Sequence, residues 1–85
     1  MELKLLIVED DLLISEAASD YFSSKGWDVE KAGDGFKALE LVRRRSFHLI
    51  LLDIMMPGMD GFAVCREIRQ DCDVPIIFIT ARVLE

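Results

Sequence analysis

Short apolar runs that alternate with longer amphipathic segments constrain the fold of this 85-residue chain more than any other feature. Lys4–Val8 and Leu49–Leu52 are apolar at nearly every position and too short for helices, a pattern typical of strands buried on both faces. Val74–Thr80 is a third buried run, and Trp27–Ala32 alternates weakly, which indicates a shorter strand. The spacing leaves room for one helix between successive strands.

Between these runs lie three segments whose apolar residues recur every three or four positions, the period of an amphipathic helix. An aspartate that can accept hydrogen bonds from the first free N–H groups precedes each segment. The predicted helices, each with its capping residue in parentheses, run from Leu12 to the region before Gly26 (Asp11), over Phe36–Arg45 (Asp34) and over Gly61–Gln70 (Asp60). Glycine tolerates the left-handed conformation that follows a helix, so Gly26 is suited to end the first one.

The apolar residues of the first two helices predict which sides face a core. In the first helix, two rows are expected to pack inward: Leu13, Ala17 and Tyr21, and Ile14, Ala18 and Phe22. In the second helix, the expected core residues are Ala38, Leu39 and Val42. Serines and acids, Ser15 among them, occupy the other side of the first helix and predict a polar face.

The predicted order of elements, βαβαβαβ, favours a single α/β domain over residues 1–85. Strands that alternate with helices are joined by right-handed crossovers into a parallel sheet with helices on both faces. Ligands in such doubly wound sheets bind at the carboxyl ends of the strands, where the strand order reverses. Functional residues are therefore expected directly after the strands.

Net charge and composition restrict the partners of the chain. Sixteen Asp and Glu against ten Lys and Arg give a formal charge of −6, so direct binding to a nucleic acid backbone is not expected. The basic run Arg43–Arg45 is interpreted as the cationic last turn of a helix. No apolar stretch is long enough for a membrane span and no signal-peptide pattern follows Met1, so a cytoplasmic location without a membrane partner is expected. Cys65 and Cys72 match no zinc or redox spacing.

Three acids follow buried strands of the predicted sheet. Glu9 and Asp10 come after the first strand, and Asp53 comes directly after the third. Carboxylates crowded at the mouth of a sheet repel one another unless they share a cation. Oxygen ligands with room for water suit Mg²⁺, and a carboxylate beside such an ion can attack a phosphoryl donor. These arguments make Asp53 the candidate nucleophile.

Other polar residues near the strand ends differ in their expected roles. Asp11 and Asp60 are expected to cap helices rather than to take part in chemistry. Asp53 is not placed to cap a helix, because a loop containing a proline and a glycine separates it from the next one. Thr80, at the end of the fourth strand, is placed to donate a hydroxyl hydrogen bond to a group transferred to Asp53.

Three segments of the sequence resemble the receiver domain of two-component response regulators. They are Leu5–Asp11 (LLIVEDD), Leu51–Gly61 (LLDIMMPGMDG) and Pro75–Ala81 (PIIFITA). The resemblance covers almost the whole chain in one register and implies a flavodoxin-like (CheY-like) doubly wound sheet. The sequence is most similar to receivers that precede a winged-helix DNA-binding domain. This similarity implies DNA binding through an output domain rather than through this segment.

The resemblance also implies a role for each residue of the site. Asp53 corresponds to the phosphoacceptor, Asp10 to an acid that binds Mg²⁺ directly, and Glu9 to an acid that reaches it through water. Met55 corresponds to the position whose backbone carbonyl completes the protein ligands, and Thr80 to a hydroxyl residue that reorients toward the phosphoryl group. The phosphoryl donors of the family are a sensor histidine kinase and small molecules such as acetyl phosphate. Because a receiver catalyses its own phosphorylation, no separate enzymatic activity is expected.

Compared with the family, the sequence stops after the fourth strand. A receiver fragment with strand order 2-1-3-4 is expected, without the last helix, strand and helix of the family and without the lysine there that binds the phosphoryl oxygens. The apolar fourth strand would then be an exposed edge, so self-association by edge pairing or by exchange of elements is expected. The alternative hypotheses are an assembly module without phosphotransfer and a fragment without function.

Overall fold

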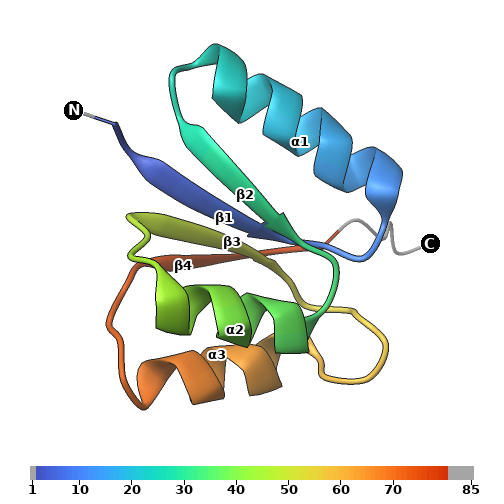
Figure 1. The fold of residues 1–85 in the computed structure, drawn as a ribbon. Helices are drawn as coiled ribbons and strands as arrows, with labels where there is room; N and C mark the ends of the chain where they lie inside the picture. The colour runs from blue at the N-terminus through green and yellow to red at the C-terminus, as the bar shows by residue number, and fades with distance from the viewer. Residues whose placement is uncertain (1, 81–85) are drawn as a thin grey trace.

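The computed structural model describes residues 2–80, and within them four strands and three helices alternate as the sequence predicts (Figure 1). Their bounds are β1 Lys4–Val8, α1 Leu12–Ser24, β2 Asp28–Ala32, α2 Gly35–Arg44, β3 Leu49–Asp53, α3 Gly61–Arg69 and β4 Ile76–Ile79. None of the helices in this range is long and apolar enough to cross a membrane. Ala81, the last residue of the third family-like segment, lies outside the described residues.

The four strands form one parallel sheet in the order β2-β1-β3-β4, which confirms the predicted topology. β1 pairs with both β2 and β3, so the strand order reverses between β1 and β3. Of the described helices, α1 covers one face of the sheet, and α2 and α3 lie side by side on the other (Figure 1). This two-sided arrangement is the doubly wound fold expected from the alternation of elements.

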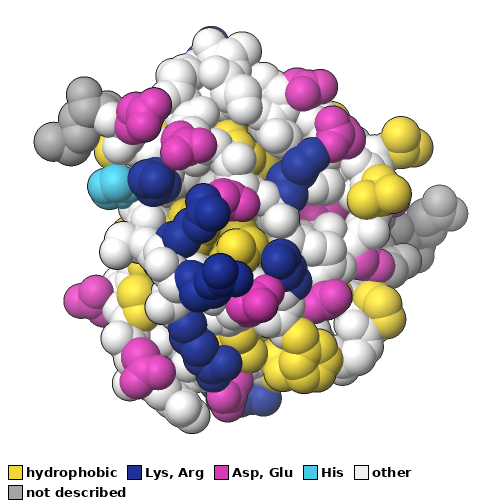
Figure 2. Space-filling view, in the orientation of Figure 1, with side chains coloured by type: hydrophobic (Ala, Val, Ile, Leu, Met, Phe, Trp, Pro, Cys, Tyr) yellow, Lys and Arg dark blue, Asp and Glu magenta, His cyan; other side chains and the backbone are white. Residues whose placement is uncertain are grey.

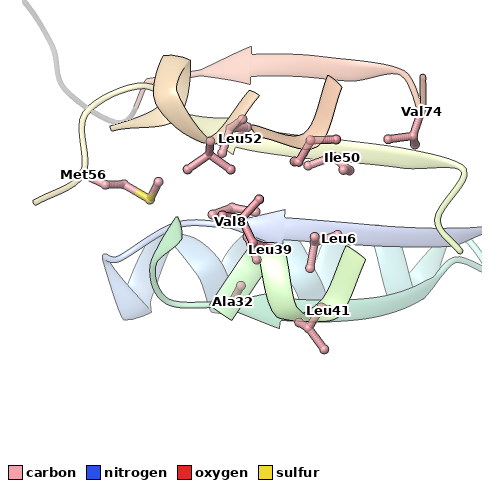
Figure 3. Packing of buried hydrophobic residues seen from close by; sticks show 12 residues of the cluster. Leu6, Val8, Ala32, Leu39, Leu41, Ile50, Leu52, Met56 and Val74 are labelled. Carbon is pink, nitrogen blue, oxygen red and sulfur yellow. The ribbon is translucent and has the colours of Figure 1, made fainter. Parts of the chain in front are cut away.

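The core occupies both faces of the two central strands. Successive residues of a strand point to opposite faces, and Leu6, Val8 and Leu52 belong to the larger cluster, on the side of α2 and α3 (Figure 3). Leu5 and Ile7 belong to a smaller cluster packed against α1. All five side chains are fully buried, which confirms the prediction that β1 and β3 are covered on both faces.

β4 is shorter and less buried than the predicted run Val74–Thr80, and it is the exposed edge that the strand order 2-1-3-4 implies. It spans only Ile76–Ile79 and lies at the edge of the described sheet. Ile76 and Ile79 are half-buried, whereas Ile77 is 51% exposed and Phe78 37% exposed. An apolar run of this kind predicts a strand correctly, but it does not report whether the strand is central or at an edge.

The predicted core side of α1 is partly wrong. Ala18 and Phe22 pack against the smaller cluster, as expected, but Leu13 is 83% exposed and Tyr21 is 58% exposed. Ser15, predicted on the polar side, is buried. The two apolar rows lie about 100° apart around the helix, and the rotation of α1 on the sheet brings the Ala18 row and Ser15 inward instead of both rows.

All three predicted capping aspartates accept hydrogen bonds from the first turn of their helices. Oδ1 of Asp11 accepts hydrogen bonds from the N–H groups of Leu13 (2.9 Å) and Ile14 (3.3 Å). Oδ1 of Asp34 accepts one from the N–H of Lys37 (2.8 Å), and Oδ1 of Asp60 accepts one from the N–H of Ala63 (2.8 Å). Gly26 follows α1 with φ at +94°, the left-handed conformation that favours glycine there. The helix boundaries predicted from capping chemistry are therefore confirmed to within one residue.

Gly61, the first residue of α3, lies against the end of β3. A Cβ atom at this position would be 2.3 Å from the carbonyl oxygen of Asp53 and 2.9 Å from Cα of Ile54. Both of these are backbone atoms, which cannot rotate away as a side chain would. The absence of a side chain at Gly61 therefore sets how closely α3 approaches the strand that carries Asp53.

We expect Gly61→Ala to lower the free energy of unfolding by about 1–3 kcal/mol, the usual cost of inserting a methyl group into packed structure. The matched control is Gly33→Ala, where no atom lies within 4 Å of the added Cβ. Its unfolding free energy should stay within about 0.5 kcal/mol of the wild type. Urea denaturation followed by circular dichroism measures both values, and equal values for the two variants would contradict the close approach.

Candidate functional site

The three acids singled out in the sequence meet where the strand order reverses. β1 and β3 are adjacent and parallel, and Val8 at the end of β1 is the register partner of Leu52 in β3. The residues that follow, Glu9 and Asp53, therefore lie side by side at the carboxyl edge of the sheet. Ligands of doubly wound sheets bind at this position.

Glu9, Asp10 and Asp53 form a compact acid cluster. Each contributes a carboxylate oxygen, and these oxygens all lie within 4.8 Å of one another. Glu9 is only 1% exposed and Asp53 3% exposed, while Asp10 is half-buried. Three carboxyl groups so close together, two of them away from water, repel one another strongly when ionised.

Backbone N–H groups orient two of these carboxylates. The N–H of Asp11 donates to Oε2 of Glu9 at 3.1 Å, and the N–H of Met55 donates to Oδ1 of Asp53 at 3.1 Å. Oε1 of Glu9 is buried and has no hydrogen-bond partner among residues 2–80. A buried polar atom without a partner is costly, so this oxygen is available to a ligand.

Burial raises the pKa of Glu9 from its usual 4.5 to about 7. The N–H of Asp11 acts in the opposite direction, because it stabilises the charged form. The nearby carboxyl group of Asp53, through its charge, and that of Asp10 add to the increase. Near neutral pH, part of the repulsion in the acid cluster is therefore relieved by a proton on Glu9.

Met55 and Thr80 lie next to the acid cluster. Met55 is the second residue after Asp53, is exposed, and lines an open depression together with Asp10. Thr80 directly follows Ile79, which is the register partner of Asp53 in β4. All five residues predicted for the site therefore lie at the same edge of the sheet, whereas Asp11 and Asp60 cap helices as predicted.

Two features of the site were not predicted from the sequence. The first is the close approach of Gly61 to the backbone of Asp53, whereas the sequence predicts Gly61 only as the start of a helix. The second is the hydrogen bond that the N–H of Asp11 donates to the carboxylate of Glu9. A glycine directly after a capping aspartate indicates a helix start that can pack closely against other backbone. Only the packing of α3 on β3 shows that this backbone belongs to Asp53 and Ile54.

The acid cluster fits a hard divalent cation. Its ligand atoms are carboxylate oxygens within 4.8 Å of one another, and one buried oxygen of Glu9 has no protein partner in the described part of the chain. Mg²⁺ prefers oxygen ligands and is commonly bound by one or two carboxylates together with water and phosphate oxygens. The half-buried position of Asp10 leaves one side of the cluster open to such ligands.

A parallel sheet of order β2-β1-β3-β4 with carboxylates at its reversal point defines a flavodoxin-like protein of the receiver class. Residues 5–84 match the Response regulator receiver domain family. The chain belongs to this family. It is 42% identical over 82 residues to the DNA-binding response regulator MtrA of Mycolicibacterium paratuberculosis, an alignment that covers 96% of this chain and 36% of MtrA.

Solved structures of receiver proteins share the fold. Chemotaxis protein CheY4 of Vibrio cholerae superposes with a TM-score of 0.92 at 30% identity, covering 99% of this chain and 72% of CheY4. Response regulator TrrA of Thermotoga maritima, solved in complex with Mg²⁺-BeF, gives a TM-score of 0.88 at 33% identity over 94% of this chain and 70% of TrrA. The chain spans about a third of the length of the curated relatives it matches.

The raised pKa of Glu9 predicts how stability depends on pH in the absence of added metal. Between pH 4.5 and about 7 the folded chain holds the Glu9 proton more tightly than the unfolded chain. The free energy of unfolding should therefore fall as pH rises through this window, by roughly 1.4 kcal/mol for each unit of pKa difference. Glu9→Gln removes the titrating group and should flatten this dependence in urea denaturation at a series of pH values.

The matched control is Glu67→Gln, which changes an exposed glutamate of α3 that has no ion pair among residues 2–80. This variant should keep the pH dependence of the wild type. A Glu9→Gln variant that also keeps it would show that the Glu9 proton does not couple to folding.

Proposed function

We propose that this chain is a phosphoacceptor receiver in which Asp53 accepts a phosphoryl group. The observation that carries the proposal is the 3% exposed carboxylate of Asp53, held within 4.8 Å of the carboxylates of Glu9 and Asp10 at the reversal point of the sheet. Membership of the receiver family supports the same role. Phosphorylation of Asp53 would switch the conformation of the domain, and no separate enzymatic activity is proposed.

The hydrogen bond from Met55 indicates which oxygen of Asp53 reacts. Oδ1 accepts the N–H of Met55, so Oδ2 is the oxygen left to attack phosphorus. An O–P bond to Oδ2 forms as the bond from phosphorus to the leaving oxygen breaks, and with acetyl phosphate the leaving group is acetate.

Asp10, Asp53 and the backbone carbonyl of Met55 are the proposed direct ligands of Mg²⁺, with Glu9 reaching it through water. When bound, Mg²⁺ would neutralise charge on the oxygens of the transferred group. Thr80, next to the register partner of Asp53, is the proposed hydroxyl donor to the phosphoryl oxygens. The structure of TrrA with Mg²⁺-BeF supports this metal, because TrrA shares the fold at 33% identity.

The proposed physiological donor is a sensor histidine kinase in the cytoplasm. The relative MtrA is described as a DNA-binding response regulator, and we propose that this chain likewise controls DNA binding by a separate output region. The chain itself carries a formal charge of −6, which disfavours direct contact with a nucleic acid backbone.

Incubation with Mg²⁺ and acetyl phosphate should add one phosphoryl group to the protein, measured as a single mass increase by intact mass spectrometry. Asp53→Asn should abolish the adduct because it removes the attacking oxygen. The matched control is Asp60→Asn. Asp60 lies in the loop next to the site and caps α3, and an asparagine can still cap the helix. Asp60→Asn should label like the wild type.

Two outcomes of the labelling experiment would refute the assignment. Persistent labelling of Asp53→Asn would place the acceptor elsewhere. A wild-type protein that unfolds cooperatively but gains no adduct would favour an assembly module without phosphotransfer.

A specific observation favours self-association as a second candidate function. β4 lies at the edge of the described sheet, with Ile77 51% exposed, and exposed Phe78 contacts exposed Phe62 at a ring-centroid distance of 5.0 Å. The opposite edge, β2, instead carries charged residues such as Asp28 and Lys31. Charges protect an edge from pairing, whereas an apolar edge is a template for another strand. We propose that two copies associate through β4.

The 85-residue chain should therefore be at least dimeric at micromolar concentration in size-resolved light scattering. Ile77→Lys should shift it toward monomer, because a lysine on an edge strand disfavours strand addition. Leu13→Lys, which changes an equally apolar but 83% exposed residue of α1, is the matched control and should leave the mass unchanged. A monomeric wild type, or equal effects of the two variants, would contradict association through β4.

A further inference from the structure

A second concave region lies at the other end of the sheet from the acid cluster. It is a cavity of about 700 Å³ between the C-terminal ends of α2 and α3, completed by the loops that lead into β3 and β4. Binding sites for small organic molecules have volumes of about 300–1,000 Å³. None of the residues of the proposed phosphotransfer site lines this α2–α3 cavity.

The floor of the α2–α3 cavity is apolar and continuous with the core. Leu39, Ile68 and Val74 line it and are buried members of the larger core cluster. Half-buried Phe47 also lines the cavity and packs against the same cluster. A ligand that enters the cavity would therefore meet an apolar surface that the fold already holds in place.

One wall of the α2–α3 cavity, the loop between α2 and β3, is tied to the sheet by two hydrogen bonds. Nδ1 of His48 accepts the N–H of Lys4 at 2.9 Å, and the N–H of His48 donates to the carbonyl oxygen of Lys4 at 2.8 Å. This loop is therefore fixed before any ligand binds. Preformed walls lower the conformational cost of binding.

Acids outnumber available cations around the α2–α3 cavity. Glu67, Asp71 and Asp73 line the side of α3 and the following loop, and none of them forms an ion pair among residues 2–80. On the side of α2, Arg45 is already paired with Glu30, outside the cavity. On the side of α3, Nη1 of Arg69 donates to the carbonyl oxygen of Cys72 at 3.2 Å, so its charge lies near these acids.

Arg43 remains as the one lining arginine without an ion pair in the described part of the chain. In Figure 2, Lys and Arg side chains form a band over α2 and α3, with acidic side chains at the lower left, where α3 ends in Figure 1. Around the cavity, the three acids Glu67, Asp71 and Asp73 therefore outnumber the two arginines without an ion pair in the described part of the chain, Arg43 and Arg69.

We propose that the α2–α3 cavity binds a small organic cation with an apolar body, such as an alkyl- or arylalkylamine. The apolar part would lie on Leu39, Ile68 and Val74, and the ammonium group would face Asp71 and Asp73. A neutral or anionic molecule of the same shape would gain the apolar contacts but not the charge complementarity. The proposal does not depend on phosphotransfer at Asp53.

Three probes with the same hexyl chain and different head groups test the proposal: hexylamine, 1-hexanol and heptanoate at neutral pH. Each is titrated into ¹⁵N-labelled protein, and shifts of the backbone amides are mapped by NMR. Hexylamine should bind most tightly, with its shifts concentrated at residues 39–48 and 67–75 and absent from α1. Tighter binding of heptanoate, equal binding of all three probes, or shifts spread over the surface would overturn the proposal.

Charge variants on the two walls should change the affinity for hexylamine in opposite directions. Asp73→Asn removes an attractive charge and should weaken binding by roughly two- to five-fold, the range for an exposed charge pair. Arg43→Gln removes a repulsive charge and should strengthen binding. Asp20→Asn, an exposed acid of α1 on the other face of the sheet, is the matched control and should leave the affinity unchanged.

All three substitutions change exposed polar side chains, and an unchanged circular dichroism melt verifies that each variant is folded. The same loss of affinity in Asp20→Asn and Asp73→Asn would mean that hexylamine responds to net charge rather than to the cavity, and would refute the proposal. Unchanged affinity in both Asp73→Asn and Arg43→Gln would refute it as well.

Discussion

The burial of carboxyl groups at one edge of the sheet is the constraint on which the rest of the structure depends. Glu9 and Asp53 are almost inaccessible to water and lie beside Asp10, an arrangement that an unsupported loop could not hold against their repulsion. Two fully buried parallel strands, β1 and β3, supply that support, because their carboxyl ends must coincide when the strands pair. Backbone N–H groups and a proton on Glu9 offset part of the electrostatic cost, and a divalent cation would offset more.

The two faces of the sheet contribute unequally to that support. The larger core cluster joins the sheet to α2 and α3, whereas the smaller one joins Leu5, Ile7 and Leu51 to α1. The central strands thus belong to both clusters and hold the acid cluster from both sides. Only the two end residues of β4, Ile76 and Ile79, pack against the core clusters, whereas Ile77 and Phe78 are exposed. The rigidity of the site and the exposed apolar edge therefore arise from the same sheet.

The sequence predicted those features that depend on local chemistry or on strand pairing. The buried strands, the caps at Asp11 and Asp60 and the meeting of Glu9 with Asp53 follow from apolar runs, side-chain hydrogen bonding and the geometry of parallel strands. The rotation of α1 did not follow, because two apolar rows satisfy the helical period equally well and only packing selects one of them. The protonation of Glu9, the contact at Gly61 and the α2–α3 cavity depend on distances between elements far apart in the chain, which periodicity does not report.

Gly61 gives α3 a mechanical role that its sequence alone does not suggest. A Cβ atom at Gly61 would lie only 2.3 Å from the carbonyl oxygen of Asp53, so a shift of the end of β3 toward α3 would move the first turn of α3 as well. A helix of nine residues, about 13 Å long, behaves as a stiff rod. The displacement would arrive at its other end, where Ile68 forms part of the cavity floor. Through Gly61, α3 would thus connect movements at the carboxyl end of β3 to the cavity at the other end of the sheet.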